Sequence, residues 1–437
     1  MHDLGPAAGT ARGGADLDQA VPAMTDSDLP EIPVRSRPLA GVPDVVDTAD
    51  GLREFAARLA DGSGPVSVDT ERAQGFRYTG RAYLVQLARG GVGIGLVDPI
   101  PLSSEDLHLL HRSIVDAEWI IHAATQDLPC LAGLGLLPER LFDTELAARL
   151  LGYPRVALGT LTESLLGIRL LKEHSAADWS RRPLPQDWLA YAALDVELLA
   201  DLRELLGSEL EAAGKADWAA QEFDYLIRRA QLPVVPRPDP WRRLSGIHTV
   251  RTPLGMAVVR ELWTERDRIA RDLDRAPGRL LGDEAIATLA AQVKRHPVRV
   301  DRQTLRAIAR FNRREARRYE SSWLEAVHRA LALPQADLPA TTVASDGPPP
   351  PGTWSHRDPA AAQRWEGVRP KVLALAQQHQ LPLENLIAPD ALRRLLWAPD
   401  GLSAPDLDTQ LSGYGVRPWQ RELVVPVIAD ILARLST

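Results

Sequence analysis

The sequence predicts an α/β domain followed by two all-helical bundles. Strand-like and helical segments alternate in the first half of the chain, as they do in α/β domains. From about residue 240 onward, apolar residues recur at spacings of three and four, which is the period of a helix. Proline-rich segments interrupt the pattern near residue 235 and between residues 334 and 354. With 437 residues, the chain is also longer than one ordinary domain.

The composition is that of a globular protein, with 45% hydrophobic and 25% charged residues. The single cysteine, Cys130, excludes an intrachain disulfide and argues against a cysteine-based zinc site, so a reducing cytoplasm is the predicted location. No apolar run reaches the roughly 20 residues of a membrane span, and the N-terminus does not resemble an export signal. We therefore expect no membrane association.

The charge is unevenly distributed along the chain. A formal net charge of −7 argues against a protein that coats nucleic acid. The segment from Arg251 to Arg329, however, contains more arginine and lysine than aspartate and glutamate. A polyanionic partner therefore remains possible for this segment.

The first part of the chain divides into a leader and the α/β domain. Residues 1–36 are rich in Gly, Ala, Pro and Asp without an apolar period, which predicts a disordered leader. Residues 37–215 contain a strand at 64–73, an antiparallel pair at "RAYLVQLA" and "GVGIGLVD", and a helix at "SSEDLHLLHRSIV" that starts at Ser103 or Ser104. The run "GGVGIG" lacks the dinucleotide-binding spacing and leads into a strand, so we expect a hairpin turn and no nucleotide cofactor.

The remainder of the chain is predicted to be helical. Residues 216–239 form a connecting helix and linker, residues 240–333 the first bundle, residues 334–354 a proline-rich linker, and residues 355–437 the second bundle. In each bundle a long helix with an early tryptophan leads to a proline, an apolar pair and an acid that opens the next helix. This parallel indicates a duplicated module.

Acidic residues lie at the ends of two predicted strands. Asp69 and Glu71 are two residues apart on a strand, so they project to the same face within about 7 Å, and like charges at that distance call for a cation. A turn or a helix cap is the alternative role for such a pair. Asp127 follows the strand "AEWIIHAA", and its alternative role is to cap the helix that begins near Leu128.

A further acid lies on a mostly apolar helix. Tyr191 and Asp195 are four residues apart and therefore share one helix face, where an acid is expected to meet a special partner. With Asp69, Glu71 and Asp127 they supply four carboxylates and a phenol, an all-oxygen set that selects Mg²⁺ or Mn²⁺ over zinc. Two such ions about 4 Å apart can activate a water and stabilise the departing oxygen during in-line attack on a phosphodiester. The residues thus predict a two-metal phosphodiesterase.

The motifs resemble those of a known superfamily. "VDTE", His122-x₄-Asp127 and Tyr191-x₃-Asp195, in this order, are similar to the three motifs of the DEDD 3′–5′ exonucleases, in their tyrosine subclass. "YLVQL", "FDTELAARLLG" and "DWSRRPLPQDWLAYAALDV" resemble ribonuclease D, and the helical bundles resemble its HRDC domains. The resemblance covers roughly residues 40–435 and implies a ribonuclease H-like fold for the α/β domain.

The resemblance also implies a role for each site residue. Asp69, Glu71 and Asp195 would bind one metal ion, and Asp69 would bridge to a second ion that Asp127 holds. Tyr191 would orient the attacking water, because a phenol with a pKa near 10 is a poor base. The segment "ERAQGFRY" is more basic than its family counterpart. This departure affects the contacts around the 3′-terminal nucleotide rather than the metal site.

Two groups of arginines are candidates for contact with nucleic acid. One group follows helical spacing and would form a basic stripe; it comprises Arg302, Arg306, Arg310, Arg314 and Arg317. A solvated helix face is its alternative role. Arg181 and Arg182 could meet backbone phosphates or form ordinary ion pairs.

The sequence therefore predicts a metal-dependent 3′–5′ exoribonuclease with two Mg²⁺ or Mn²⁺ ions. It would release nucleoside 5′-monophosphates from RNA with a free 3′ end, such as tRNA precursors. A DNA exonuclease is one alternative, because the acidic site does not read the 2′-hydroxyl. A non-catalytic RNA-binding protein is another, although an idle site has no physical reason to keep mutually repelling carboxylates.

Overall fold

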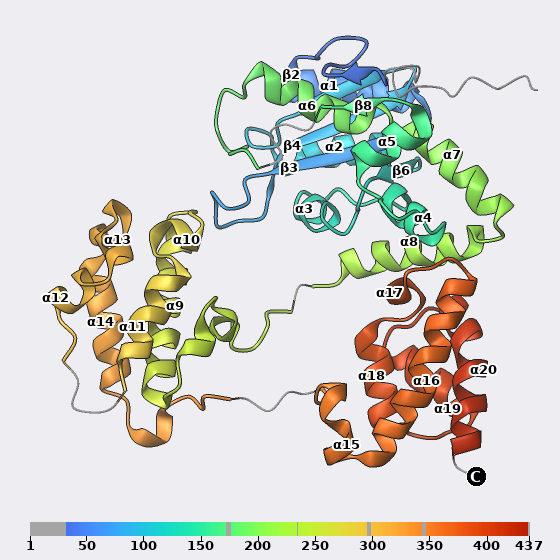
Figure 1. The fold of residues 1–437 in the computed structure, drawn as a ribbon. Helices are drawn as coiled ribbons and strands as arrows, with labels where there is room; N and C mark the ends of the chain where they lie inside the picture. The colour runs from blue at the N-terminus through green and yellow to red at the C-terminus, as the bar shows by residue number, and fades with distance from the viewer. Residues whose placement is uncertain (1–31, 172–175, 234, 295–298, 343–346, 436–437) are drawn as a thin grey trace, which may run out of the picture.

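The computed structural model describes residues 32–171, 176–233, 235–294, 299–342 and 347–435. In Figure 1 the α/β domain lies at the top, the first helical bundle at the lower left and the second bundle at the lower right. Residues 1–31 of the predicted leader lie outside the described residues. Among the described residues, no helix is long and apolar enough to cross a membrane.

The α/β domain is built on a mixed six-stranded sheet with the order β2-β5-β4-β3-β6-β7. β4 runs antiparallel to β3 and β5, whereas β2, β6 and β7 are parallel to their neighbours. The predicted antiparallel pair is therefore confirmed, and "GGVGIG" includes its turn. The strands are β2 (Val45–Val46), β3 (Ser63–Arg72), β4 (Ala82–Gly90), β5 (Gly93–Val97), β6 (Glu118–Ile121) and β7 (Arg140–Asp143), and a separate parallel pair is formed by β1 (Val34–Arg35) and β8 (Arg169–Leu170).

Helices follow and cover these strands. The predicted start of α2 is confirmed, because Ser103 and Asp106 form a reciprocal capping box there. The helices are α1 (Ala49–Asp61), α2 (Ser104–Ile114), α3 (Leu128–Gly133), α4 (Thr144–Leu150), α5 (Leu158–Leu166), α6 (Gln186–Glu197), α7 (Leu199–Ala212) and α8 (Ala216–Gln231).

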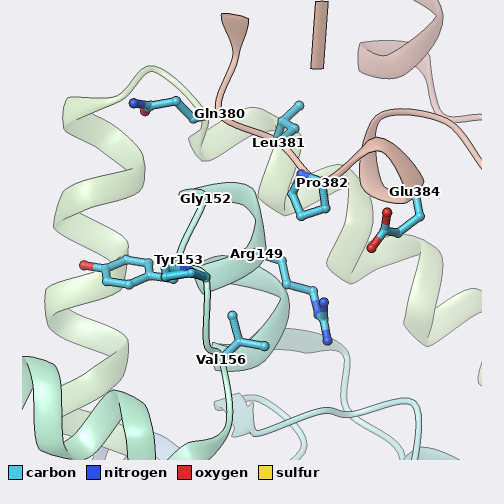
Figure 2. Close-up of a pocket in the computed structure, with 9 residues that line it drawn as sticks. Arg149, Gly152, Tyr153, Val156, Gln380, Leu381, Pro382 and Glu384 are labelled. Atoms are coloured by element: carbon cyan, nitrogen blue, oxygen red, sulfur yellow. The ribbon is translucent and has the colours of Figure 1, made fainter. Parts of the chain in front are cut away.

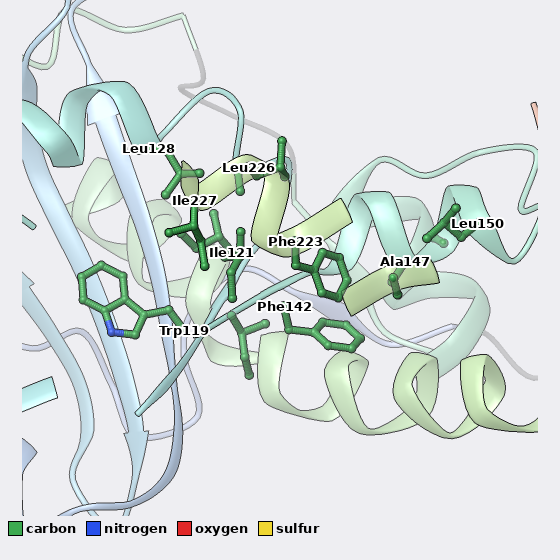
Figure 3. Close-up of a cluster of buried hydrophobic side chains, with 14 of the residues drawn as sticks. Trp119, Ile121, Leu128, Phe142, Ala147, Leu150, Phe223, Leu226 and Ile227 are labelled. Atoms are coloured by element: carbon green, nitrogen blue, oxygen red, sulfur yellow. The ribbon is translucent and has the colours of Figure 1, made fainter. Parts of the chain in front are cut away.

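Helix α8 completes the core of the α/β domain beside β7. Figure 3 shows Phe223 and Ile227 of α8 among the side chains of β6 and β7. The rings of Phe142 and Phe223 are 5.1 Å apart, a favourable distance for an aromatic pair. The predicted connecting helix therefore packs on the sheet that carries the acidic residues.

The first bundle contains α9 as its longest helix, and one prediction about this bundle is wrong. "DRQTLRAIARFNRREARRYE" is not a single helix, because the backbone is extended at Ile308 and Arg313. The breaks bury Ile308 and Phe311, and the Asn312 amide donates to the carbonyl of Arg306. The elements are η1 (Pro240–Arg243), η2 (Ile247–Thr249), α9 (Pro253–Asp272), α10 (Pro277–Leu280), α11 (Asp283–Gln292), α12 (Arg302–Arg306), η3 (Ala309–Asn312), α13 (Arg314–Arg318) and α14 (Glu320–Leu331).

The second bundle begins where the proline-rich linker ends. Trp354 is buried there against Trp365 and Trp397, and its indole N–H donates to the carbonyl of Pro349. The end of the linker is therefore packed on the bundle. η4 (Gln335–Asp337) follows α14 beside the first bundle. The elements of the second bundle are η5 (Pro351–Thr353), α15 (Trp354–Arg357), α16 (Pro359–Gln378), α17 (Leu383–Leu386), α18 (Pro389–Trp397), α19 (Ala404–Gly413) and α20 (Pro418–Leu435).

The first bundle forms several hydrogen bonds with the loop that follows β3. The Asp274 carboxylate accepts from the backbone N–H and the hydroxyl of Thr79, at 3.0 and 2.9 Å. The hydroxyl of Tyr78 donates to Asp267, and the N–H of Ala276 donates to the carbonyl of Phe76. Because β3 carries Asp69 and Glu71, this bundle helps to fix the chain directly beyond the acidic pair.

The second bundle docks on α8 and on the end of α4. The buried Glu222 accepts from Arg417 at 2.6 Å and from the Trp419 indole at 2.9 Å. Nearby, Gly152, Tyr153 and Leu381 line a cavity of about 370 Å³ (Figure 2). Gly152 has a φ of +84°, and a Cβ there would lie 2.5 Å from the carbonyl oxygen of Gln380. Only glycine fits at this contact.

Replacing Gly152 by alanine should therefore weaken the docking of the second bundle. Gly214 is a matched control, because its φ of +67° is similar but nothing lies within 4 Å of its Cβ position. We expect Gly214→Ala to lose about 1–2 kcal/mol from the left-handed backbone alone. Gly152→Ala should lose about 1–3 kcal/mol more through the clash. Urea denaturation of both variants measures the difference, and equal losses would contradict the close approach.

Candidate active site

The structure brings three of the predicted acids together at one face of the sheet. Asp69 and Glu71 project from the same face of β3, and α6 packs across β3, β4 and β5 to bring Asp195 to them. Each residue offers an oxygen within 4.8 Å of the others. Glu71 is buried, and the other two are partly exposed. The strand spacing and the helix position thus produce the cluster that the sequence predicts.

Asp127 does not cap α3, so the alternative role considered for it is wrong. Its side chain makes no capping hydrogen bond and instead accepts from the hydroxyl of Thr70 at 2.6 Å. Asp127 is not one of the acids within 4.8 Å of each other, but its charge contributes to raising the pKa of both Asp69 and Asp195. It therefore lies beside the cluster as a fourth carboxylate.

The loop that carries Asp127 is held by Asp143, a residue that the sequence analysis did not assign to the site. The carboxylate of Asp143 accepts from the N–H groups of Ala123 at 3.1 Å and Ala124 at 2.9 Å. It also accepts two N–H groups at the start of α4. Ala123 has a φ of +61°, an unusual conformation for alanine that these hydrogen bonds stabilise. An aspartate directly before a helix was the available sequence signal.

Gln86 is a second residue that was missed. It lies directly opposite Asp69 on β4, and its amide N–H donates to the Asp69 carboxylate at 3.3 Å. The side chain is fully buried, and its carbonyl oxygen has no hydrogen-bond partner among the described residues. Gln86 therefore restricts the orientation of Asp69 from within the sheet. Its signal was a lone amide in the apolar strand "YLVQL".

Tyr191 lies on α6 above the cluster. Its hydroxyl hydrogen-bonds to Asp195. Burial, followed by the negative charges of Asp195, Glu71 and Asp69, raises the pKa of Tyr191 well above its usual value of 10. The phenol therefore stays protonated at any working pH and can act as a donor but not as a base.

The carboxylates repel one another in the absence of a cation. Burial and the neighbouring acids raise the pKa values of Asp69 and Glu71 well above their usual range. Burial raises the pKa of Asp127 to about 6, and burial together with the charge of Asp127 raises that of Asp195 to about 7. A set of converging, repelling oxygen ligands fits a hard divalent cation. The residues present therefore suit Mg²⁺ or Mn²⁺.

The arginines differ in how far their donors are already engaged. Arg182 uses all five N–H donors within the protein, on both Asp98 oxygens and on the carbonyls of Tyr83, Trp179 and Arg181. The ion-pairing alternative is therefore confirmed for Arg182. Arg181 is exposed, and no side-chain hydrogen bond or ion pair to a described residue is found for it.

The five arginines of the first bundle divide in a similar way. Arg302 and Arg306 pair with Glu320, and Arg310 pairs with Glu284. Arg314 and Arg317 are exposed on α13. Because the predicted helix is broken, these side chains do not form the regular stripe that helical spacing would give.

Comparison with known proteins agrees with this geometry. Residues 43–211 match the family model of a 3′–5′ exonuclease, and residues 256–327 match that of the HRDC domain. Residues 347–432 match a different model, described as a 3′ to 5′ exonuclease C-terminal domain. The HRDC character predicted for the second bundle therefore stays a prediction.

Relatives that match across several domains extend the comparison. The ribonuclease D of Gluconacetobacter diazotrophicus is 36% identical over 321 residues, which cover 71% of this chain and 78% of that protein. A crystal structure of a protein from Bifidobacterium adolescentis has a TM-score of 0.82 at 38% identity and covers 92% of this chain and 100% of its own. Escherichia coli RNase D, at 23% identity with a TM-score of 0.62 and coverages of 90% and 98%, shows the shared fold.

The fold and the acidic site define a 3′–5′ exonuclease followed by an HRDC domain and a C-terminal helical domain. The chain belongs to the ribonuclease D family. It is therefore a 3′–5′ exoribonuclease, a hydrolase.

Removing Arg182 should destabilise the exonuclease domain, whereas removing its neighbour should not. Arg182→Met leaves the buried Asp98 carboxylate without its bidentate partner, which should cost about 3 kcal/mol. Arg181→Met removes an exposed guanidinium and should change stability by less than about 0.5 kcal/mol. Thermal and urea denaturation test the pair. Equal effects of the two substitutions would show that the Asp98 pair is not structural.

The stability of the metal-free protein should depend on pH through the acidic cluster. The raised pKa values mean that the folded protein holds protons that the unfolded chain releases, so these groups should lower stability as pH rises from about 4 to above 7. In EDTA at pH 8, Asp195→Asn should therefore raise the free energy of unfolding by about 1 kcal/mol or more. At pH 5 the gain should shrink. Denaturation of wild type, Asp195→Asn and the exposed control Asp187→Asn at both pH values measures this, and a pH-independent gain would refute it.

Proposed function

We propose that the cluster is a two-metal exonuclease site in which Asp69, Glu71 and Asp195 hold one divalent ion. Asp69 would share a second ion with Asp127. The observation that carries the proposal is the convergence of three carboxylates within 4.8 Å, with a fourth beside them. Mg²⁺ or Mn²⁺ bound there would supply charge neutralisation and an acidified water for phosphodiester hydrolysis. The products would be nucleoside 5′-monophosphates.

The remaining residues of the site would position the reacting groups. Tyr191, protonated and hydrogen-bonded to Asp195, would donate a hydrogen bond that orients the attacking water. Gln86 and Thr70 would fix the carboxylates of Asp69 and Asp127 before substrate arrives. Such preorganisation lowers the cost of assembling the site during each turnover.

We further propose that the substrate is RNA with a free 3′ end, of the structured or precursor type exemplified by tRNA precursors. Escherichia coli RNase D is described as an exoribonuclease involved in structured RNA processing, which supports this substrate class. The exposed Arg181, Arg314 and Arg317 would contact backbone phosphates. Arg302, Arg306 and Arg310 could contribute only by exchanging their glutamate partners for phosphates.

The second bundle would share the HRDC architecture of the first. The longest helix of each bundle has 20 residues, proline at its first position and an oxygen-bearing cap, Thr252 or Asp358. A four-residue helix follows in each, and it ends in extended backbone at Leu281 and Ile387. The repeated order of helix caps and helix ends supports duplication of one module better than the identity of the residues does.

We propose a cytoplasmic location because the thiol of Cys130 is buried and protonated. The thiol is buried between Thr70 and Asp127, and burial raises the pKa of its sulfur above the usual value. A buried, protonated thiol beside the site is compatible with a reducing compartment.

Activity assays test the two-metal site directly. A 5′-labelled single-stranded RNA should shorten from its 3′ end in Mg²⁺ or Mn²⁺, and EDTA should stop the reaction. Asp69→Asn should lower kcat/KM on the order of a thousandfold, because it removes a ligand of both proposed ions. Tyr191→Phe should lower kcat by about a hundredfold, and Asp187→Asn should not change it.

A DNA strand of identical sequence, assayed in parallel, tests whether the enzyme prefers RNA or DNA as its substrate. Binding of RNA without shortening in any ion would favour the non-catalytic alternative.

A further inference from the structure

The residue after Glu71 leaves the regular pattern of the sheet. Glu71 pairs with Leu84 on β4, but Arg72 pairs with Ala82, so the register shifts between them. Such bulges are common next to active sites, where they re-aim a side chain. Arg72 therefore lies at the edge of the acidic cluster. The bulge changes the direction of its side chain from the one it would have in a regular strand.

The guanidinium of Arg72 lies near acids from two different motifs. One of its N–H groups donates to the side-chain carbonyl of Gln126, at 3.3 Å, and Gln126 directly precedes Asp127. The positive charge of Arg72 offsets part of the rise in the pKa of Glu71 and of Asp127. Arg72 is thus the cation that faces the cluster from the side of the Asp127 loop.

Most donors of Arg72 are available to a ligand. In the described part of the chain, the side chain makes the single hydrogen bond to a neutral amide and no ion pair within 4.0 Å. It is partly exposed. Arg182 has the opposite character, since all five of its donors are used within the protein. A guanidinium with free donors beside several carboxylates is poised for an anion that enters the site.

We propose that Arg72 is a catalytic residue that contacts a non-bridging oxygen of the 3′-terminal phosphodiester of the substrate. This inference rests on the proposed function of the acidic cluster. A phosphate that approaches four carboxylates is repelled by them, and Arg72 supplies opposite charge in a planar fork that matches two phosphate oxygens. The amide of Gln126 holds the fork in place without neutralising it.

Kinetics of three variants test the charge and the fork separately. Arg72→Gln should lower kcat/KM by about tenfold to a hundredfold. Arg72→Lys keeps the charge but loses the bidentate geometry, so it should recover part of that loss. Arg112→Gln, an exposed arginine on α2, is the control and should match wild type. Thermal unfolding and Mn²⁺ titration calorimetry should show the same fold and metal affinity in all variants.

Binding without turnover tests the contact itself. Two fluorescent RNAs, both 2′-deoxy next to the terminal linkage, differ only in a neutral methylphosphonate at that linkage. In EDTA, the methylphosphonate should weaken binding to wild type several-fold but should not weaken binding to Arg72→Gln. Such coupling, measured by fluorescence anisotropy, reports a direct interaction between the arginine and that phosphate.

The outcomes separate this inference from the proposed function. If both proteins lose the same affinity with the methylphosphonate, Arg72 does not touch the terminal phosphate and the inference is overturned. The same holds if Arg72→Gln matches wild type in kcat/KM. If wild type shows no metal-dependent turnover, the proposed function fails, and coupling in the binding cycle would then leave Arg72 as a phosphate-binding residue only.

Discussion

The constraint on which the site depends is the repulsion between Asp69, Glu71, Asp195 and Asp127. Burial raises the pKa values of all four groups, and neighbouring negative charges add to the rise for Asp69, Glu71 and Asp195, so without a cation these acids cost the protein stability. Neighbouring parts of the structure hold Asp69, Asp127 and Asp195 in place despite this cost. An opposing strand residue, a hydroxyl on β3 and a helix packed over the sheet supply these restraints. The carboxylates of the site therefore repel one another but are held in place. Both features favour binding of a divalent cation.

The helical bundles contribute to that rigidity. The first bundle holds the loop beyond Glu71 through Asp274 and Asp267, so displacement of the bundle would alter the exit of β3. The second bundle docks through Glu222 on α8, which in turn supports β7. The loop after the central strand β3 and the helix packed on the edge strand β7 are thus held by segments more than a hundred residues away in sequence. A tethered RNA-binding module would not need such contacts.

The sequence was informative where function depends on local periodicity. Asp69 and Glu71 share a face because strands repeat every two residues, and Tyr191 meets Asp195 because helices repeat every 3.6. It was uninformative where tertiary packing overrides local preference. The helical pattern from Arg302 to Arg318 is broken because its apolar side chains must reach one core. Asp143 and Gln86 were missed because their roles are defined by partners on other segments.

The ion pairs of the arginines explain why the net charge of the chain is a poor guide to its substrate. Most arginines that the sequence offered as phosphate contacts are already paired with carboxylates, so their number in the sequence overstates the positive charge that is available to RNA. We propose that attraction for the substrate comes from guanidinium groups that keep free donors, such as Arg72 and Arg314. Selectivity for the 3′ end would come from the ions and the arginine at the site rather than from a broad basic surface.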